Sequence, residues 1–541
     1  MKKIIALFAV VMMATITALA TGPFRNHRWE SFRSLMPNGE SIVFVGNSIT
    51  NMHDWWEAFG DNQNILNRGT SGGFTYEVLP NLESIIAGHP AKVFIGIGTN
   101  DICEVQSLET TADNIRIIAE RILRESPNTK VYVQSTLPST SNAASSVDVK
   151  GRGVRNPALN ALVEAKINAL REAYSNVEYV NVFGELVDTD GKSLKKHNGN
   201  SIAFDNLHPN VLGYGLWCQY IQGKVGTNCI YDTETTTLYA GGHGSDSTGD
   251  RITCFAQQNV SAEDVLIIGD EMVSSGEWHE LLKSPHAKNR GLGWGYTGSE
   301  LNQEITNAPI YFKNKTADPK AVVIYAGVQE ARSSLSTADF QTRYQTLITA
   351  LREQVASKIY LLTPLHTPNA AENTRIDDYN ATALPALVGA NENVHIIDAT
   401  ELNGNTSKYY YSGDGGNYLT SFGYVKVAQK IAAAITDAGF TAITDQECET
   451  NNTLIANRTV LGNAITDAMR LTAPANIGSG VGQYAASNLE GINAAIDEAC
   501  IMLRTNDNTA EQLQAKANAL KAITPTLNAI TSEIVLYSCS L

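Results

Sequence analysis

Short apolar runs alternate with longer stretches of helical periodicity through the first part of the chain. The runs predict buried parallel strands at residues 41–45, 65–67, 92–97, 130–134 and 178–182. The stretches between them carry apolar residues three and four positions apart and predict helices at 75–87, 108–125 and 157–174. Strands that alternate with helices form a parallel sheet covered on both faces, and ligands bind such sheets at the carboxyl ends of the strands.

The first predicted strand ends in Gly46-Asn47-Ser48, directly before a stretch of helical spacing. A serine at this place suits a nucleophile, because the free backbone N–H groups of a helix N-terminus can face developing negative charge. The alternative is a serine that only caps the helix. This stretch by itself leaves both interpretations open.

The next two predicted strands also run into polar or glycine-rich loops. The second strand leads into residues 67–73, where glycines such as Gly72 allow a backbone to approach a ligand closely, although a plain turn is the alternative. The third strand leads into residues 96–101, where Asn100 offers an amide donor that can hold an oxyanion. An Asx turn is the alternative for Asn100.

A fourth motif, Asp205-Asn206-Leu207-His208-Pro209, precedes an apolar helix that begins near Gly213-Tyr214. A carboxylate three residues before an imidazole can fix its tautomer and stabilise the imidazolium. A metal-binding pair and a purely structural capping pair are the alternatives. No further His or carboxylate clusters near the motif, which disfavours the metal.

Together, the four motifs resemble the sequence blocks of the SGNH (GDSL-type) hydrolases, in the same order, over about residues 41–222. The resemblance implies an ester hydrolase without cofactor, in which Ser48 is the nucleophile, His208 the base and Asp205 its orienting acid. It also implies an oxyanion hole made by the backbone N–H groups of Ser48 and Gly72 and the side chain of Asn100. Asn47 stands where the family often has Asp, but that carboxylate is not the triad acid.

The chain then repeats itself over about residues 250–440. Five segments repeat earlier patterns. Residues 265–271 repeat the first strand and its loop, and residues 322–330 repeat the third strand and its loop. In the same way 289–291 repeats 67–69, 358–361 repeats 130–133, and 422–424 repeats 212–214. This part therefore resembles a second SGNH unit. Its counterparts of Ser48, Gly72, Asn100, Asp205 and His208 are Glu271, Trp294, Gln329, Gly415 and Tyr418.

A carboxylate cannot be activated as a serine is, and no imidazole stands in the equivalent place. We therefore expect the second unit to be non-catalytic. It serves either as a scaffold or as a binding unit whose Trp278, Trp294 and Tyr296 stack on sugar, and aromatic residues are also ordinary core material.

Residues 447–541 are rich in Ala, Asn and Thr and predict helices at 455–471, 485–503 and 510–530. They predict a small three-helix bundle and resemble the FIVAR-type modules of surface and secreted polysaccharide enzymes. The expected fold class is thus α/β, with two tandem three-layer α/β/α flavodoxin-like SGNH units, residues 24–230 and 250–440, followed by the C-terminal three-helix bundle.

The first 20 residues have the pattern of a signal peptide: Lys2-Lys3, an apolar stretch at 4–16 and Ala18-Leu19-Ala20. The apolar stretch is short for a membrane anchor, and no later stretch is long enough. We therefore expect a secreted, periplasmic or cell-surface protein without membrane insertion after cleavage. Among its seven cysteines, Cys218 and Cys229 are the closest pair in sequence and a candidate disulfide.

The formal net charge of -15 argues against a nucleic acid as partner. The expected function is a serine esterase that removes O-acyl groups, most simply O-acetyl groups, from carbohydrate or another small ester. A lipase or lysophospholipase is an alternative, disfavoured because no long apolar lid segment lies near Ser48. A glycan-binding protein without enzymatic activity, built on SGNH scaffolds, is the other. Acyl length, sugar identity and oligomeric state stay open.

Overall fold

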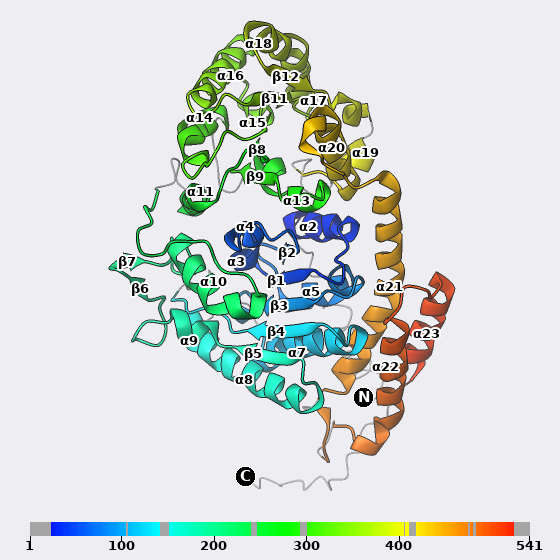
Figure 1. Cartoon of the computed structure of the whole chain (residues 1–541). Coiled ribbons are helices and arrows are strands. Elements are labelled where there is room, and N and C mark those ends of the chain that lie inside the picture. The colour runs from blue at the N-terminus through cyan, green and yellow to red at the C-terminus, as the bar shows by residue number, and fades with distance from the viewer. Residues whose placement is uncertain are drawn as a thin grey trace, which may run out of the picture.

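The computed structural model describes residues 23–103, 106–140, 151–239, 246–292, 300–404, 406–410, 418–473, 476–479 and 483–523. The predicted signal peptide at residues 1–20 lies outside these ranges. Figure 1 shows two α/β units stacked one above the other, with a long helix running along one side of both.

The first unit holds a five-stranded parallel sheet in the order β2-β1-β3-β4-β5. Its strands are β1 Ile42–Gly46, β2 Ile65–Gly69, β3 Lys92–Gly96, β4 Lys130–Gln134 and β5 Val177–Val180. All five predicted strands are confirmed; β4 matches at both ends, and the ends of the other four shift by at most two residues. The order is that of flavodoxin-like sheets, in which the crevice for ligands opens beside the first strand.

Alternating side chains of the strands bury into helices on the two faces of this sheet. On one face, Val43 and Val45 join the core under α5 Thr75–Asn81, α6 Glu83–Ile86, α7 Leu108–Glu125 and α8 Gly151–Ala173. On the other face, Ile42 and Phe44 pack with α3 Ser48–Asn51, α4 Trp55–Ala58, α9 Val182–Leu186 and α10 Val211–Val225. The remaining elements are α2 Pro23–Ser34, the 3-10 turn η1 Asp101–Cys103 and the small hairpin β6 Lys196–His197 with β7 Asn200–Ser201.

The second unit holds another five-stranded parallel sheet with the same order, read as β9-β8-β10-β11-β12. Its strands are β8 Val265–Gly269, β9 Ala287–Gly291, β10 Ala321–Tyr325, β11 Lys358–Leu362 and β12 Val394–Ile397. The helices are α11 Asp246–Gln257, α12 Glu271–Ser274, α13 Trp278–Leu281, α14 Glu300–Tyr311, α15 Val328–Arg332, α16 Thr337–Arg352, α17 Ala370–Asp378, the π-helical turn η2 Tyr379–Ala383, α18 Leu384–Ala390, η3 Thr400–Gly404, α19 Thr406–Tyr409, α20 Ser421–Ala434 and η5 Thr436–Ala438.

The two units repeat individual hydrogen bonds as well as strand order. Trp55 Nε1 donates to the carbonyl of Thr50 at 2.8 Å, and Trp278 Nε1 donates to that of Val273 at 2.8 Å. The hydroxyls of Tyr214 and Tyr424 likewise donate to backbone carbonyls of α3 and α12. The repeated sequence segments therefore build the same local structure twice.

Two buried ion pairs join the units, and each unit contributes the arginine of one pair and the glutamate of the other. Arg68 reaches from β2 to both carboxylate oxygens of Glu280, at 2.8 and 2.7 Å. Arg290 reaches from β9 to both oxygens of Glu57, at 2.8 Å each. Arg68 and Arg290 occupy the same place in the repeated Asn-Arg-Gly segment, so each unit gives the other an equivalent bond.

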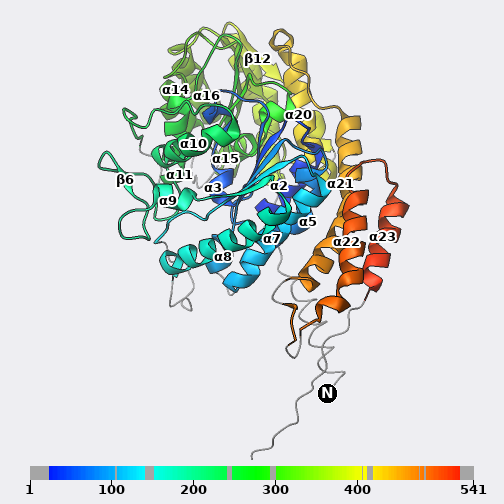
Figure 2. The same cartoon turned by 60° about the horizontal axis from the view of Figure 1, so that its bottom comes forward.

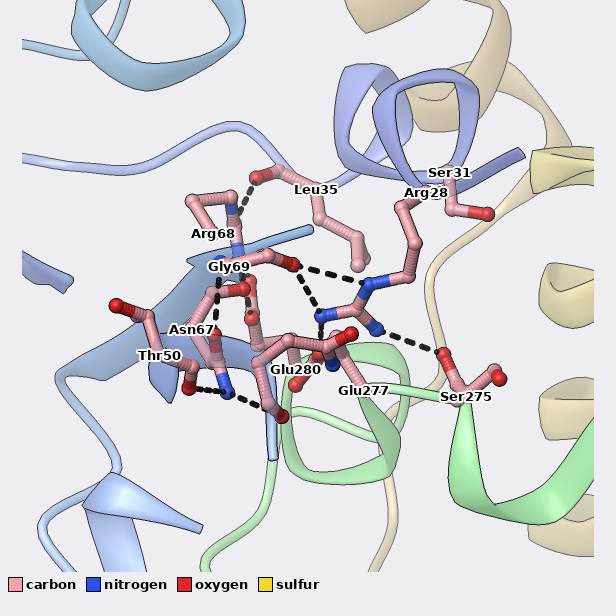
Figure 3. Close-up of polar contacts among 12 residues, drawn as sticks. Arg28, Ser31, Leu35, Thr50, Asn67, Arg68, Gly69, Ser275, Glu277 and Glu280 are labelled. Carbon is pink, nitrogen blue, oxygen red and sulfur yellow. Dashed lines mark hydrogen bonds and ion pairs between the residues drawn. The ribbon is translucent and has the colours of Figure 1, made fainter. Parts of the chain in front are cut away.

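Further contacts close this interface. Figure 3 shows Arg28 of α2 beside the Arg68 pair, where its guanidinium donates to the carbonyls of Gly69 and Ser275. The ring of Trp56 stacks on that of His279 with 4.6 Å between centroids. Burial favours the protonated form of Glu57, but Arg290 and Lys288 outweigh it and hold the pKa of this carboxyl below its ordinary value. The charges at the interface are thus paired across it.

The C-terminal part forms the three predicted helices, α21 Asp445–Leu471, α22 Glu490–Met502 and α23 Ala510–Ala522, with the short turn η7 Ala486–Asn488. Figure 2 shows the three helices side by side, next to α5 and α7. Helix α21 begins ten residues before the predicted start, because Thr444 and Glu447 form a capping box there. Arg458 of this helix donates to buried Glu83 of the first unit at 2.9 Å, which ties the bundle to that unit.

The sequence also led us to expect a chain that does not insert into a membrane and a disulfide between Cys218 and Cys229. Among the described residues, no helix has both the length and the apolar character that a membrane crossing requires. The expected disulfide is not formed, since Cys218 and Cys229 are both free thiols. The sulfur of Cys218 lies 3.9 Å from His53 Nε2, and that of Cys229 lies 3.9 Å from the carbonyl of Gly215. The two thiols also hydrogen-bond to each other, so they are neighbours without being bridged.

Candidate active site

Ser48 is the first residue of α3, at the carboxyl end of β1, and its side chain is only 7% exposed. The residue that caps this helix is Asn47, whose side-chain oxygen accepts from the backbone N–H of Ile49 at 3.0 Å. The alternative role of Ser48 as the cap is therefore wrong. Its hydroxyl instead lies 2.9 Å from His208 Nε2, across 160 residues of chain.

The Asp205 carboxylate holds His208 in place through one hydrogen bond to the imidazole of His208 and another to its backbone N–H. Asp205 Oδ2 lies 2.8 Å from His208 Nδ1, while Oδ1 accepts from the backbone N–H groups of Leu207 and His208 at 2.7 and 2.5 Å. Partial burial favours the protonated carboxyl, yet these bonds outweigh it and keep the pKa of Asp205 below its ordinary value. An ionised Asp205 accepts a hydrogen bond from Nδ1–H, which keeps the proton on Nδ1 and leaves Nε2 free to take the proton of Ser48.

Three residues that sequence reasoning missed support this loop. The ring of Phe204 stacks on the imidazole of His208, with 5.4 Å between centroids and an interplanar angle of 5°. The Ser139 hydroxyl donates to the carbonyl of Asn206 at 2.7 Å. Asn210 caps α10 directly after the loop. Two of these roles had a signal in the sequence, because Phe204 stands next to the motif and Asn210 stands before a predicted helix. Nothing in the sequence marked Ser139.

Gly72 lies in the loop after β2 with a left-handed backbone, φ +73°, and a Cβ there would meet Arg25 Nη1 at 2.9 Å. A residue with a side chain would be strained at this place, so the loop depends on glycine. Asn51 of α3 anchors the same loop, because its side-chain oxygen accepts from the backbone N–H and the hydroxyl of Ser71. The Gly72 loop is thereby held against the helix that begins with Ser48.

The Asn100 side chain also reaches this loop, since its Nδ2 donates to the carbonyl of Gly73 at 3.0 Å. The bond joins residues 27 positions apart, so this donor acts between two loops and not within a local turn. An amide NH₂ carries two donors, which leaves one to act on a ligand. Ser48, the Gly72 loop and Asn100 thus follow three neighbouring strands at one edge of the sheet.

Asp101 is a further residue whose role the sequence did not reveal. Its buried carboxyl accepts from the backbone N–H of Thr75 at 3.0 Å and from the Thr75 hydroxyl at 2.5 Å. Burial raises its pKa to about 6, against the opposing effect of the Thr75 bonds. These bonds fasten the loop that carries Asn100 to the start of α5.

The metal alternative for Asp205 and His208 finds no support. In the described ranges, no three His, Cys, Asp or Glu side chains are grouped so that they could hold a metal ion. The two side chains are hydrogen-bonded to each other, and the second imidazole nitrogen is engaged with Ser48. The arrangement is suited to moving a proton away from a hydroxyl.

The corresponding place in the second unit holds different chemistry. Glu271 begins α12 as Ser48 begins α3, and Asp270 caps that helix as Asn47 does. Tyr418 is buried and stacks on His27, with 4.5 Å between ring centroids. Trp278 is buried in the core with its N–H bonded to Val273, so of the two alternatives for this residue the core role is confirmed and sugar stacking is wrong. Trp294, Tyr296 and Gly415 lie outside the described residues.

These geometries can be set beside known proteins. Residues 39–216 match the model of the GDSL-like lipase/acylhydrolase family. The match covers the loops that carry Ser48, Gly72, Asn100, Asp205 and His208, and it supports the resemblance of the first unit to SGNH hydrolases. It also supports an esterase type of function for this GDSL-like unit.

Solved structures resemble the chain over a similar share of its length. A Streptococcus pneumonia protein, provisionally described as a platelet activating factor, is 27% identical and is matched over 40% of this chain and 98% of its own, with a TM-score of 0.31. A provisionally described acylhydrolase from Bacteroides fragilis is 23% identical over 37% and 94%, with a TM-score of 0.30. The Clostridium thermocellum family 3 carbohydrate esterase is 16% identical over 34% and 98%, with a TM-score of 0.26. The comparison with curated proteins found no match.

Proposed function

We propose that the protein is a secreted serine esterase whose GDSL-like unit, residues 24–230, removes O-acyl groups, chiefly acetyl, from carbohydrate. The observation that carries the proposal is the hydrogen-bonded series from Ser48 through His208 to Asp205. The match to an acylhydrolase family supports the same reaction class. The acidic composition, the signal-peptide pattern and the resemblance of the C-terminal bundle to FIVAR-type modules support a carbohydrate substrate outside the cell.

In the proposed reaction, His208 Nε2 takes the Ser48 proton while Oγ attacks the ester carbonyl carbon. The carbonyl oxygen becomes an oxyanion that faces the backbone N–H groups of Ser48 and Gly72 and the free amide hydrogen of Asn100. His208 then gives its proton to the leaving alcohol, which leaves an acyl group on Ser48. Water repeats the same steps and releases the carboxylic acid, so that Ser48 regains its proton.

We propose a supporting role without turnover for the second unit, residues 250–440, and for the bundle at residues 447–541. Tyr418, in the place of His208, cannot act as the base. The paired charges between the units support a structural role for the second one.

The substrate class is tested with p-nitrophenyl esters of increasing acyl length and with a panel of acetylated glycans, with released acetate as the readout. We expect hydrolysis of p-nitrophenyl acetate, release of acetate from at least one glycan, and no activity of the Ser48→Ala chain on either. Preference for long acyl chains would favour the lipase alternative. Absence of hydrolysis on every ester would favour the glycan-binding alternative.

Replacing Asn100 by Ala is expected to lower kcat by roughly a hundred- to a thousand-fold with little change in KM, because the lost donor acts on the oxyanion and not on the bound ester. Steady-state kinetics on p-nitrophenyl acetate measure both constants. A matched control is Asn176→Ala, which removes an amide that bonds to the carbonyls of Pro127 and Thr129. These residues precede β5 and β4, so they lie at the amino ends of the strands, at the opposite edge of the sheet from the site. A change confined to KM would assign Asn100 to substrate binding.

Introducing serine into the second unit should not create a second active site. In a chain that already carries Ser48→Ala, Glu271→Ser is expected to leave ester hydrolysis at background, because Tyr418 stands in the place of His208. His366 lines the same cavity as Glu271, but its Nε2 is bonded to Asp377. Turnover of p-nitrophenyl acetate by the double variant above that of Ser48→Ala alone would show that the second unit retains catalytic groups.

A further inference from the structure

A small cavity lies at the carboxyl edge of the second sheet, at the place that Ser48 holds in the first. It has a volume of about 10 Å³ and is lined by Asp270, Glu271, Glu300, Gln303 and Gln329, together with Gly269 and Leu292. An adjoining cavity of about 20 Å³ shares three of these residues, Asp270, Glu271 and Gln329. Each has room for a group the size of a water molecule.

Two buried side chains that line the smaller cavity have polar atoms without a partner. Neither carboxyl oxygen of Glu300 has a hydrogen-bond partner in the described part of the protein, although the residue is only 2% exposed. The same holds for the amide nitrogen of Gln303, which is 5% exposed. Buried polar atoms in native proteins nearly always have a partner in the protein or an ordered water, so these atoms mark a place where a water or a polar ligand group can bind.

The ionisable side chains that line the smaller cavity are all acidic. Asp270, Glu304 and Glu330 are buried close to Glu300, and burial together with their repulsion raises the pKa of Glu300 well above its ordinary value. Burial likewise raises the pKa of Asp270 to about 7 and that of Glu304 to about 8. Arg332 lines the adjoining cavity and lies 3.7 Å from Glu372, so it is shared with another carboxylate.

We propose that this cavity binds the primary ammonium group of a small hydroxylated amine, the class to which amino sugars belong. An ammonium group is close to water in size and carries three donors and a positive charge, which suits the two open oxygens of Glu300 and the neighbouring Glu271. Burial favours the protonated form of Glu300 in the empty site, and a bound ammonium would favour the ionised carboxylate, with the proton released to solvent. The open amide donor of Gln303 suits a hydroxyl beside the amine. The cavity lining holds the carboxyl groups of Asp270, Glu271 and Glu300 and no cationic side chain, which disfavours an anion. In the described ranges no three acidic, His or Cys side chains are placed to hold a metal ion.

The site would give the second unit a ligand of its own. Its helix α12 presents Glu271 at the start, where the first unit presents a nucleophile, so the same position on a repeated fold serves recognition in one copy and the proposed chemistry in the other. A cationic sugar held there would be bound by the same chain that carries the esterase site.

The test is isothermal titration of the full chain with glucosamine. Glucose, which has the hydroxyls without the amine, and N-acetylglucosamine, in which the amine is an uncharged amide, are the comparison probes. We expect one glucosamine per chain and no measurable heat with the other two sugars. Equal binding of glucose, or no binding of glucosamine, would overturn the proposal.

Variants locate the site. Glu300→Gln keeps the size of the side chain and removes its charge, and we expect it to weaken glucosamine binding by about tenfold or more. Glu271→Gln, at a partly exposed position where folding is not at risk, should weaken it in the same direction. Glu263→Gln, an exposed carboxylate of the same unit paired with Lys320, is the matched control and should bind as the parent does. Unchanged affinity in both Glu300→Gln and Glu271→Gln would contradict the assignment.

Discussion

Replacement of Ser48 by Ala is expected to abolish ester hydrolysis, with a loss on the order of a million-fold in kcat. The hydroxyl is the atom that lies 2.9 Å from His208 Nε2, and alanine has no hydroxyl to make that contact. The fold should survive, because Asn47 and not Ser48 caps α3. Kinetics on p-nitrophenyl acetate, with the melting temperature measured alongside, check both parts of the expectation.

The other members of the series give graded controls. His208→Ala should cost about as much as Ser48→Ala, because nucleophile and base act as a unit. Asp205→Asn should cost less, on the order of ten-thousand-fold, because it leaves the other two groups in place. Ser41→Ala removes a buried hydroxyl that bonds only within its own turn near Asn38 and should turn over as the parent does. Near-parental turnover by Ser48→Ala would exclude it as the nucleophile.

The second large effect is expected at the interface between the two units. Replacing Arg290 by Met should lower the free energy of unfolding by about 3–5 kcal/mol, because it leaves the buried carboxylate of Glu57 without its bidentate partner. The Arg68→Met variant should behave alike, since Arg68 pairs with Glu280 in the equivalent place. Urea unfolding followed by circular dichroism measures both.

A double variant separates the ion pair from other effects of substitution. Changing Glu57 to Gln together with Arg290 to Met removes both charges, and we expect it to be less destabilised than the sum of the two single variants. Additive losses would show that the two side chains do not depend on each other. A chain shortened to residues 24–230 leaves Glu57 and Arg68 without partners, so we expect it to be insoluble or much less stable than the full chain.

The strands and the positions of the site residues could be predicted from the sequence because both depend on local pattern. Buried parallel strands are short apolar runs, and the residues that follow them meet at one edge of the sheet. The pairing of Ser48 with His208, which are 160 residues apart, is instead implied by the resemblance of the four motifs to the SGNH hydrolases. The helical periodicity of residues 108–125 gave α7 with both ends correct.

What the sequence did not reveal depends on contacts between distant parts of the chain. Arg68 and Glu280 are 212 residues apart, and neither lies in a pattern that marks a buried ion pair. Helix α8 begins before the predicted start at residue 157, in a region where Arg155 binds the carbonyls of Ile102 and Gln106. Closeness in sequence indicates that Cys218 and Cys229 are neighbours, and their thiols are in contact, but it does not determine whether the two sulfurs are bridged.

The most direct test of the proposed nucleophile is covalent labelling. The full chain is treated with a fluorophosphonate, which reacts with activated serine hydroxyls, and the digested protein is analysed by mass spectrometry. We expect one phosphonylated peptide, modified at Ser48, and we expect no label in the Ser48→Ala or His208→Ala chains. Labelling at a different residue, or equal labelling of the Ser48→Ala chain, would contradict the assignment of Ser48 as the activated serine.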